Sequence, residues 1–447
     1  MYGKLGLFIL LVFILPEDTK SRMIKTVNRF RCDAGNSYPY TGIKTPYSKV
    51  YNGTINHINL PNCKPLQIWL LCRHGTRFPK TTKILEMLNM TRFRDLIVNN
   101  HEIDHRGQLC RRNLRALKRW RSFPELDATK GKHLSLQGRK DLSSLGNRLR
   151  RKFPELFVED VPEKYKFRST NTPRTIDSMM FFVKGSFKDT FSVKLEVGSA
   201  SNDTLLKIYE NCEPWEKERF SKEVTAFING SEMTKVITDI SRRLGFVNNI
   251  SKEDAFLLYD MCRFERAWQP SKESPWCAAF TDEDMHVFEY EEDLYHYYSV
   301  GPGREINSKL GCHPLRDMVD RFTKLENAED SDEPRGVFYF THSEMIMLFY
   351  SVMEIGKNPV HLTASNYRDM QHRNWRTSLL VPFATNFATV FYRCDSSDSP
   401  FKIAFYLAEK PLTLEGCNNG VCDWAQLKKK LVPIAANCST EVCWKTS

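Results

Sequence analysis

The chain is 447 residues long, roughly three times an average domain, so it has room for a second domain or a large insertion. Hydrophobic residues make up 41% and charged residues 27%, which excludes a mostly disordered chain or a coiled coil. The net charge of +11 favours a polyanionic partner, and phosphate-rich small molecules, nucleic acid and glycosaminoglycan all remain open on charge alone.

The first predicted element is a signal peptide over residues 1–21, with an approximate end. Its apolar run, Leu5–Leu15, is too short to cross a ~30 Å hydrocarbon core but suits the h-region of a secretory signal. No later apolar run is long enough to span a membrane, and Val442–Ser447 is neither a retention signal nor a lipid-anchor tail. We therefore expect secretion through the endoplasmic reticulum without stable membrane insertion.

Sequons and cysteines favour the same compartment. The 13 cysteines suit an oxidising environment, and their odd number leaves at least one thiol unpaired. Cys72 is the candidate, because it ends the apolar run Gln67–Cys72. The pairs Cys262/Cys277 and Cys417/Cys422 are close enough for local bridges, although spacing does not fix connectivity. Six Asn-x-Ser/Thr sequons mark possible glycosylation sites: Asn52, Asn89, Asn202, Asn229, Asn249 and Asn437.

Strand-like and helix-like segments alternate along the chain. The strand-like runs are Gln67–Cys72, Tyr165–Arg168, Gly336–Thr341, Thr377–Tyr392 and Phe401–Leu407. Helical stretches are Arg111–Arg121, Pro173–Lys184 and Glu289–Tyr298. This alternation predicts an α/β domain with a mostly parallel sheet flanked by helices, formed by residues 22–184 and 326–447. Residues 185–325 are poor in strand runs and are predicted to form a smaller, mainly helical insert domain.

The most informative segment directly follows the first strand. Arg73-His74-Gly75-Thr76-Arg77 places two guanidinium groups and an imidazole where ligands bind in open α/β sheets, beyond the carboxyl ends of strands. Arginine matches phosphate oxygens in pairs, and Gly75 allows backbone N–H groups close to an anion. A basic surface loop with a structural histidine is the alternative for this motif taken alone.

Two other strand ends carry groups of the same kind. Strand Gly336–Thr341 runs into His342-Ser343-Glu344, which adds a second imidazole and a potential proton donor. The strand ending at Arg168 supplies a further guanidinium group, with Arg174 six residues later. Three such strand ends together favour one site over a coincidence.

These motifs resemble those of the histidine acid phosphatase family. The nearest branch is that of the multiple inositol polyphosphate phosphatases, which have Arg-His-Gly-Thr-Arg and His-Ala-Glu where most relatives have His-Asp. Ser343 here replaces the Ala, a small-for-small change expected to act as a spacer. Phe288–Leu294 and Phe405–Leu412 also resemble that branch, so the likeness covers roughly residues 35 to 430.

The resemblance implies a role for each motif residue. His74 is expected to be the nucleophile that forms a phosphohistidine, and Glu344 the general acid for the leaving alkoxide. The expected ligands of the phosphoryl oxygens are Arg73, Arg77, Arg168 and His342. No metal or other cofactor is implied, because the arginines supply the countercharge.

Two other segments could be mistaken for functional sites. His101–His105 matches the zinc-protease pattern His-Glu-x-x-His, with Glu125 at a plausible distance for a third ligand, but Gly107 follows too soon for a full helix. We interpret it as a solvated loop or a helix end. The run Arg111–Arg121 holds six basic residues and is interpreted as a solvated helix face with Leu114 and Leu117 inward. The alternative is an electropositive wall that attracts a polyphosphorylated substrate; nucleic-acid binding is not favoured, because no binding module accompanies the run.

The leading hypothesis is a secreted phosphomonoesterase acting on inositol hexakisphosphate and lower inositol phosphates, with 2,3-bisphosphoglycerate as a related substrate. A broad-specificity secreted acid phosphatase is the alternative, which Glu344 in place of the usual Asp argues against. A secreted binding or allergen-like protein with a vestigial site is disfavoured, because all the expected groups are present. The aromatic residues Tyr290, Tyr295, Tyr297 and Tyr298 are expected to belong to the core.

Overall fold

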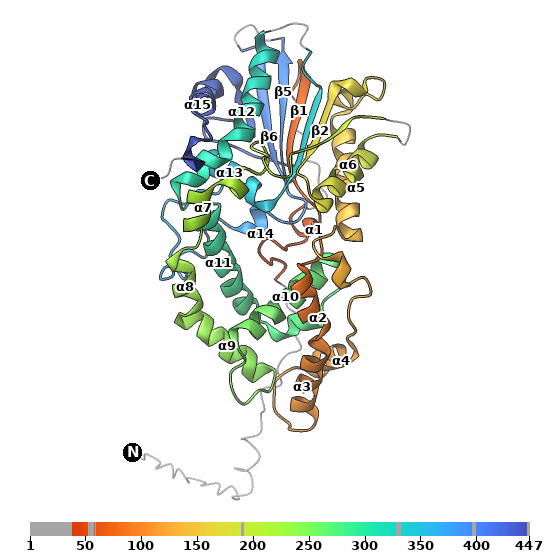
Figure 1. Ribbon diagram of the computed structural model, residues 1–447, viewed down its shortest axis with the longest axis vertical. Helices are drawn as coiled ribbons and strands as arrows, with labels where there is room; N and C mark the ends of the chain where they lie inside the picture. Colours follow the sequence, from red (N-terminus) through yellow and green to blue (C-terminus); the bar gives the residue numbers. More distant parts are fainter. Residues whose placement is uncertain are drawn as a thin grey trace, which may run out of the picture.

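The computed structural model describes residues 38–51, 58, 60–188, 192–327, 332–395 and 399–444. The predicted signal peptide and the sequon at Asn52 lie outside these residues. A β-sheet with helices on both faces forms the upper part of the molecule in Figure 1, and a lobe of helices lies below it. None of the helices within the described ranges combines the length and the apolar character that a membrane span requires.

The sheet has eight strands within the described residues, in the order β3-β2-β4-β1-β5-β6-β7, with β8 pairing β6. The strands are β1 (Cys63–Arg73), β2 (Tyr165–Ser169), β3 (Leu195–Val197), β4 (Gly336–Thr341), β5 (Asn386–Cys394), β6 (Phe401–Leu407), β7 (Lys410–Pro411) and β8 (Val421–Asp423). The predicted bounds of β4 and β6 are confirmed to the residue. Within the predicted strand Thr377–Tyr392, the first turn is instead the short helix α14 (Thr377–Leu380).

The predicted α/β class is confirmed, but the sheet is mixed rather than mostly parallel. Strands β3, β2, β4 and β1 run parallel, whereas the pairs β1–β5, β5–β6, β6–β7 and β6–β8 are antiparallel. Only a short connection separates β5 from β6, too short for the crossover that parallel neighbours need. The C-terminal half of the sheet therefore returns as hairpins.

Strand alternation divides the core between the two faces of the sheet. Ile68, Leu70 and Cys72 of β1 face one side, in the cluster that includes Leu145 of α5 (Leu136–Lys152) and Phe182 of α6 (Pro173–Ser186). Trp69 and Leu71 face the other side, in the cluster shared with α12, α13 and α15. These last three helices are α12 (Glu305–Asn327), α13 (Ser343–Val352) and α15 (Trp424–Ala436). β1 is therefore buried on both faces, which explains its almost unbroken apolar sequence.

The lower lobe does not follow the predicted domain boundaries. Besides helices from 185–325, it contains helices from the part assigned to the α/β domain. Of these, α2 contacts α10, and α4 contacts the 3-10 helix Pro275–Ala279. Conversely, β3 and all but the end of α12 fall within 185–325 but belong to the sheet and its cover. The lobe helices are α2 (Thr81–Leu88), α3 (Met90–Glu102), α4 (Arg111–Arg119), α8 (Lys222–Ile228), α9 (Ser231–Arg243), α10 (Lys252–Trp268) and α11 (Asp282–Ser299). Two short helices, α1 (Tyr47–Val50) and α7 (Glu213–Glu218), lie between the lobe and the sheet in Figure 1.

The predicted cysteine states are confirmed. Cys262–Cys277 and Cys417–Cys422 are bridged, and Cys72 is a buried free thiol. Three further bridges that join described residues are long-range: Cys63–Cys394, Cys212–Cys443 and Cys312–Cys438.

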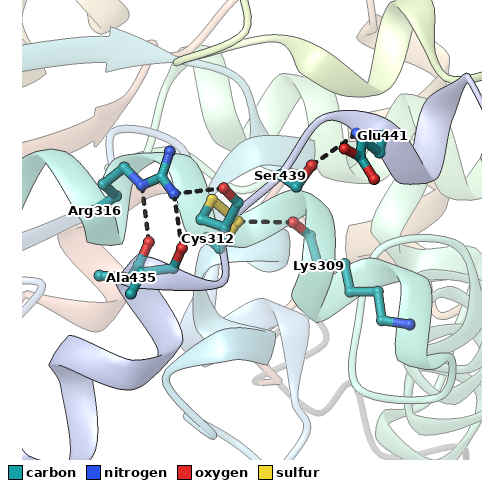
Figure 2. The surroundings of a disulfide bond; sticks show 8 residues. Lys309, Cys312, Arg316, Ala435, Ser439 and Glu441 are labelled. Atoms are coloured by element: carbon teal, nitrogen blue, oxygen red, sulfur yellow. Dashed lines mark hydrogen bonds between the residues drawn. A yellow bond between two sulfur atoms is a disulfide. The ribbon is translucent and has the colours of Figure 1, made fainter.

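The bridge Cys312–Cys438 fastens the end of α15 to α12 (Figure 2). One helical turn along α12, Arg316 donates hydrogen bonds to the carbonyls of Ala435 and Ala436 at 2.8 and 3.2 Å, and to that of Cys438. The last carbonyls of a helix lack partners within the helix, so this guanidinium group supplies donors where they are needed.

Candidate active site

The site forms where the carboxyl ends of β1 and β4 lie side by side. The two strands are parallel and pair Arg73 with Thr341, so the residues that follow them leave the sheet at one edge. The His74 N–H donates to the Thr341 carbonyl across 3.0 Å, and the His74 and His342 ring centroids are 5.6 Å apart. The structure therefore brings together two motifs that lie far apart in the sequence.

His74 is held with one ring nitrogen free to act as a nucleophile. Its Nδ1 lies 2.8 Å from the carbonyl oxygen of Gly75, which can only accept, so Nδ1 carries the proton and the lone pair lies on Nε2. Burial, then the charges of Arg174 and Arg73, lower the pKa of His74 well below its usual 6.5. The imidazole is therefore neutral in mildly acidic as well as neutral solution.

Arg73 is fixed from behind by backbone carbonyls. Its Nη1 donates to the carbonyls of Ile43 at 2.6 Å and Val381 at 2.7 Å, and the guanidinium carbon lies 4.6 Å from the centroid of the Phe383 ring. Only 1% of the residue is exposed, and burial lowers its pKa to about 9, which still leaves it charged at neutral pH. The cation is therefore positioned before any ligand arrives.

Arg77 provides a second, half-buried cation on the same loop. Its Nη1 donates to the Phe78 carbonyl across 2.8 Å. Burial, then the positive charge of Arg174, lowers its pKa to about 10. The charges of Arg77 and Arg174 repel each other in this half-buried place, and a bound anion would offset that repulsion.

His342 links the end of β4 to the loop that follows β2. Arg174 Nη2 lies 3.0 Å from His342 Nδ1, and Thr170 Oγ1 lies 3.0 Å from His342 Nε2. A guanidinium group can only donate, so Nδ1 accepts and Nε2 carries the proton toward Thr170. Burial and the charge of Arg174 lower the pKa of His342 below its usual value, which agrees with this neutral tautomer.

The structure brings Arg174, rather than the predicted Arg168, to the histidines. Arg168 Nη2 forms an ion pair with Asp203 Oδ1 at 2.7 Å, and the Asp203 side chain is only 1% exposed. Arg174 contacts His342 directly and contributes to the lowered pKa values of His74 and Arg77. The structure therefore places Arg174 beside the histidines and pairs Arg168 with Asp203, which makes Arg174 the candidate for the role expected of Arg168.

A local signal could have identified Arg174 in the sequence. Pro173 is the first residue of α6, and proline is favoured at that position of a helix. A charged residue in the first turn of a helix that follows a strand lies beside the strand's carboxyl end. Arg168, in contrast, is still inside β2, where its direction is set by the strand.

Glu344 lies in the first turn of α13, beside His342. Its Oε2 accepts a hydrogen bond from the Ser343 hydroxyl at 2.9 Å. Burial raises the pKa of the Glu344 carboxyl, but His342 in its charged form, a backbone N–H and the Ser343 hydroxyl lower it more, so the net direction is downward. Ser343 is thus a hydrogen-bonding neighbour of the carboxyl group and not the spacer that the sequence suggested.

Gly75 is required for packing rather than for contact with an anion. A Cβ on Gly75 would lie 2.6 Å from the Gly138 carbonyl oxygen in α5 and 2.7 Å from a Leu142 methyl group. The Gly75 N–H is also already engaged, because it donates to Ser178 Oγ at 3.1 Å. The glycine therefore lets the motif loop lie directly on α5.

The zinc-protease pattern lies at the end of α3, as expected. His101 Nδ1 is 2.7 Å from the Ile97 carbonyl, and its Nε2 accepts from the Leu109 N–H at 3.1 Å, so both ring nitrogens are occupied. His105 follows the helix in a left-handed conformation with φ 54°. Within the described ranges, Cys312, His313 and Cys438 are the group close enough to share a metal, and both cysteines are consumed by their disulfide.

The arrangement suits attack on an anionic electrophile. One unprotonated imidazole nitrogen is surrounded by guanidinium groups that can hold negative oxygens, and a carboxyl group is available for proton transfer. The remaining sequence predictions have mixed outcomes. Tyr290 and Tyr297 are buried in the core as expected, whereas Tyr295 and Tyr298 are only half-buried.

Comparison with known proteins gives a consistent result. A profile of the histidine phosphatase superfamily (branch 2) matches residues 66–406. Multiple inositol polyphosphate phosphatase 1 of Drosophila melanogaster is 32% identical over 410 residues, which cover 90% of this chain and 86% of that protein.

Two solved structures share the fold. The phytase from D. castellii superposes with a TM-score of 0.69 at 18% identity, covering 97% of this chain and 93% of that one. The multiple inositol polyphosphate phosphatase of Bifidobacterium longum, in complex with inositol hexasulfate, gives 0.65 at 13% identity, covering 88% and 97%.

Proposed function

The chain belongs to branch 2 of the histidine phosphatase superfamily, and we propose that it removes phosphate groups from inositol polyphosphates through a phosphohistidine on His74. The observation that carries the proposal is the state of His74. Its Nδ1 is tied to the Gly75 carbonyl, which leaves Nε2 as the nucleophile beside arginines.

In the first step, His74 Nε2 attacks phosphorus and the bond from phosphorus to the leaving oxygen breaks. Arg73, Arg77 and Arg174 hold the three non-bridging oxygens as negative charge spreads over them. The buried Nε groups of Arg73 and Arg174 have no hydrogen-bond partner among the described residues, and a phosphoryl group would provide acceptors for them. Glu344 gives its proton to the leaving alkoxide.

In the second step, water attacks the phosphohistidine. Glu344, now ionised, accepts a proton from the water molecule. At the same time the water oxygen bonds to phosphorus and the Nε2–P bond breaks. The products are inorganic phosphate and neutral His74, and the net reaction consumes one water molecule.

The lowered pKa of Glu344 makes the proton donor dependent on the substrate. In the ligand-free site, a backbone N–H and the Ser343 hydroxyl favour the carboxylate. A bound phosphate brings negative charge beside it, and a nearby like charge raises the pKa of a carboxyl group. The bound substrate therefore favours the protonated form of Glu344, which its leaving group needs.

Additional cations favour a substrate with more than one phosphate. Burial, followed by the charges of Arg174, Lys80 and Arg77, lowers the pKa of Lys132. Lys132 and Lys80 therefore add positive charge near these two arginines. Lys207 contributes in the same way to His342. Inositol hexakisphosphate and lower inositol phosphates fit this field, and 2,3-bisphosphoglycerate is a smaller candidate.

Phosphate release from the purified chain tests the substrate class. Inositol hexakisphosphate, 2,3-bisphosphoglycerate and p-nitrophenyl phosphate are compared at one pH and low ionic strength. We expect kcat/KM for the hexakisphosphate to exceed that for p-nitrophenyl phosphate at least tenfold, and to fall more steeply with added salt. Equal values for all three would indicate a broad acid phosphatase instead, and no turnover of any would indicate a vestigial site.

We also propose that the protein is secreted and glycosylated. The bridged cysteines favour an oxidising compartment, and the sequon residues Asn89, Asn202, Asn229, Asn249 and Asn437 are all exposed. Expression in cultured animal cells tests this: the protein should appear in the medium and lose mass on treatment with an N-glycosidase. Retention in the cytosol without a mass change would refute it.

A further inference from the structure

Helix α4 carries its basic residues on one face. At about 100° per residue, Arg111, Arg112, Arg115, Lys118 and Arg119 fall within an arc of roughly 120°. Leu117 lies on the opposite side and is 2% exposed, which fixes the helix against the lobe. The five basic side chains are exposed.

Carboxylates neutralise only part of this face. Lys118 pairs with Glu102 at 2.6 Å, and Arg112 lies 3.9 Å from Glu273. In the part of the chain that the structure describes, no carboxylate lies within ion-pair distance of Arg111, Arg115 or Arg119. Successive members of this trio are four residues apart, about 6 Å along the helix axis. They form a row of uncompensated charges about 12 Å long.

The row is separate from the catalytic site. In Figure 1, α4 lies low in the helical lobe, beside α3 and away from the sheet. Helix α4 is therefore not part of the sheet edge that carries His74 and His342.

We propose that the α4 face binds a linear sulfated polysaccharide of the glycosaminoglycan type. Such a chain repeats its sulfate and carboxylate groups along one axis, which matches a straight row of guanidinium groups. The face has no exposed aromatic side chain on which nucleic-acid bases could stack, because Trp120 at its end is 5% exposed. It also lacks the apolar strip with which an amphipathic helix enters a membrane, since Leu117 faces inward.

Matched variants of the full-length protein test this proposal. The first carries Arg111→Gln, Arg115→Gln and Arg119→Gln. The control carries Arg151→Gln, Lys222→Gln and Lys429→Gln, which remove three exposed, unbridged positive charges from other surfaces. Both variants lose three units of charge, so they differ only in where the charge is lost.

The measurement is the dissociation constant for a size-defined heparin oligosaccharide at 0.15 M salt. We expect the α4 variant to bind at least about tenfold more weakly than the wild type and the control to change by less than about twofold. Turnover of p-nitrophenyl phosphate should be the same in all three proteins, which shows that they are folded and keeps this test separate from the proposed enzymatic function. Equal weakening of both variants would mean that only net charge matters and would overturn the proposal.

A DNA oligonucleotide with the same number of charges serves as the competing polyanion. The wild type should prefer the heparin oligosaccharide. Binding DNA equally well or better would exclude the polysaccharide as the specific ligand of this face.

Discussion

The catalytic site and the α4 face both concentrate arginine, but they hold it in opposite ways. Arg73 in the site is 1% exposed, and its Nη1 is fixed by two carbonyl oxygens. Arg111, Arg115 and Arg119 of α4 are exposed to solvent, and no carboxylate of the described residues pairs with them. The difference lies in desolvation. A buried cation attracts an anion strongly at short range, whereas water and salt screen the attraction of an exposed cation.

This contrast separates two ways of recognising an anion. A buried, prepositioned guanidinium group distinguishes one phosphoryl geometry from another, because its direction cannot adjust. An exposed row responds to the number and spacing of charges on a flexible partner. Substitutions in the site should therefore change kcat, and substitutions on α4 should change binding alone.

The largest expected effect is at His74. His74→Ala should lower turnover of every phosphate ester by at least ~10³-fold, because no other group of the site can accept the phosphoryl group. Rapid-quench labelling with a phosphorylated substrate should yield an acid-labile, base-stable adduct in the wild type and none in the variant. The exposed His372 serves as a control, and His372→Ala should be unaffected. A His74→Ala protein that keeps a tenth of wild-type kcat would refute the nucleophile assignment.

Glu344→Gln should come next, and its effect should depend on the leaving group. We expect a loss of about 10²-fold or more on glycerol 2-phosphate, whose alkoxide needs a proton, and less than about tenfold on p-nitrophenyl phosphate. Steady-state kcat for the two substrates provides the measurement. Equal losses would contradict a general acid at this position.

The pair Arg174 and Arg168 tests which arginine belongs to the buried site. Arg174→Ala should lower kcat/KM by about 10²-fold, the loss seen when one prepositioned donor is removed from a transition state. Arg168→Ala should stay within about fivefold, but it leaves the buried Asp203 carboxylate unpaired and should lower the unfolding free energy by about 1–3 kcal/mol. The measurements are kcat/KM and the unfolding free energy in urea for both variants. A large loss of kcat/KM in Arg168→Ala and a small one in Arg174→Ala would assign the phosphate-binding role to Arg168 instead.

The pH profile tests the buried environment directly. Because burial and the arginines lower the pKa of His74, the nucleophile stays unprotonated as pH falls through 6.5. Glu344 gains its proton as pH falls, so kcat/KM for an alkyl phosphate should rise from pH 7 to pH 5. A decline over that range in the titration of kcat/KM would mean that His74 has an ordinary pKa and is not buried among cations.

The smallest effect is expected for Ser343→Ala. The Ser343 hydroxyl donates to Glu344 Oε2 and lowers the pKa of that carboxyl group, so its removal should raise the pKa. We expect kcat to change by less than about threefold and the alkaline limb of the alkyl-phosphate profile to move slightly upward in pH. An unchanged profile would show that the hydroxyl is only a spacer.

The sequence was sufficient to locate the buried part of the site. Apolar runs in the sequence identify strands β1 and β4, and each strand ends directly at its motif. His74 and His342 could therefore be placed at one sheet edge from the sequence alone. Local patterns also gave the strand bounds of β4 and β6. These features depend on neighbours in the chain, which a sequence displays.

What the sequence could not supply depends on partners far along the chain. The ion pair of Arg168 could not be predicted, because its partner, Asp203, lies 35 residues later and nothing local marks the pair. The antiparallel half of the sheet and the recruitment of α2 and α4 into the helical lobe likewise depend on contacts between distant segments. Ser343 was predicted to be a spacer because the sequence does not show whether a serine hydroxyl donates a hydrogen bond to its neighbour.

The position of β1 in the sheet has a consequence for the synthesis of the protein. Its two neighbours are β4, beginning at Gly336, and β5, beginning at Asn386. At about 5–20 residues per second, the ribosome needs roughly ten seconds to a minute to make the chain between β1 and β4. During that time an almost entirely apolar strand has both edges open, and such an edge pairs readily with other chains. A nascent chain therefore keeps both edges of this strand unpaired until its last quarter emerges, and a chain that terminates before β5 cannot complete the sheet that carries His74.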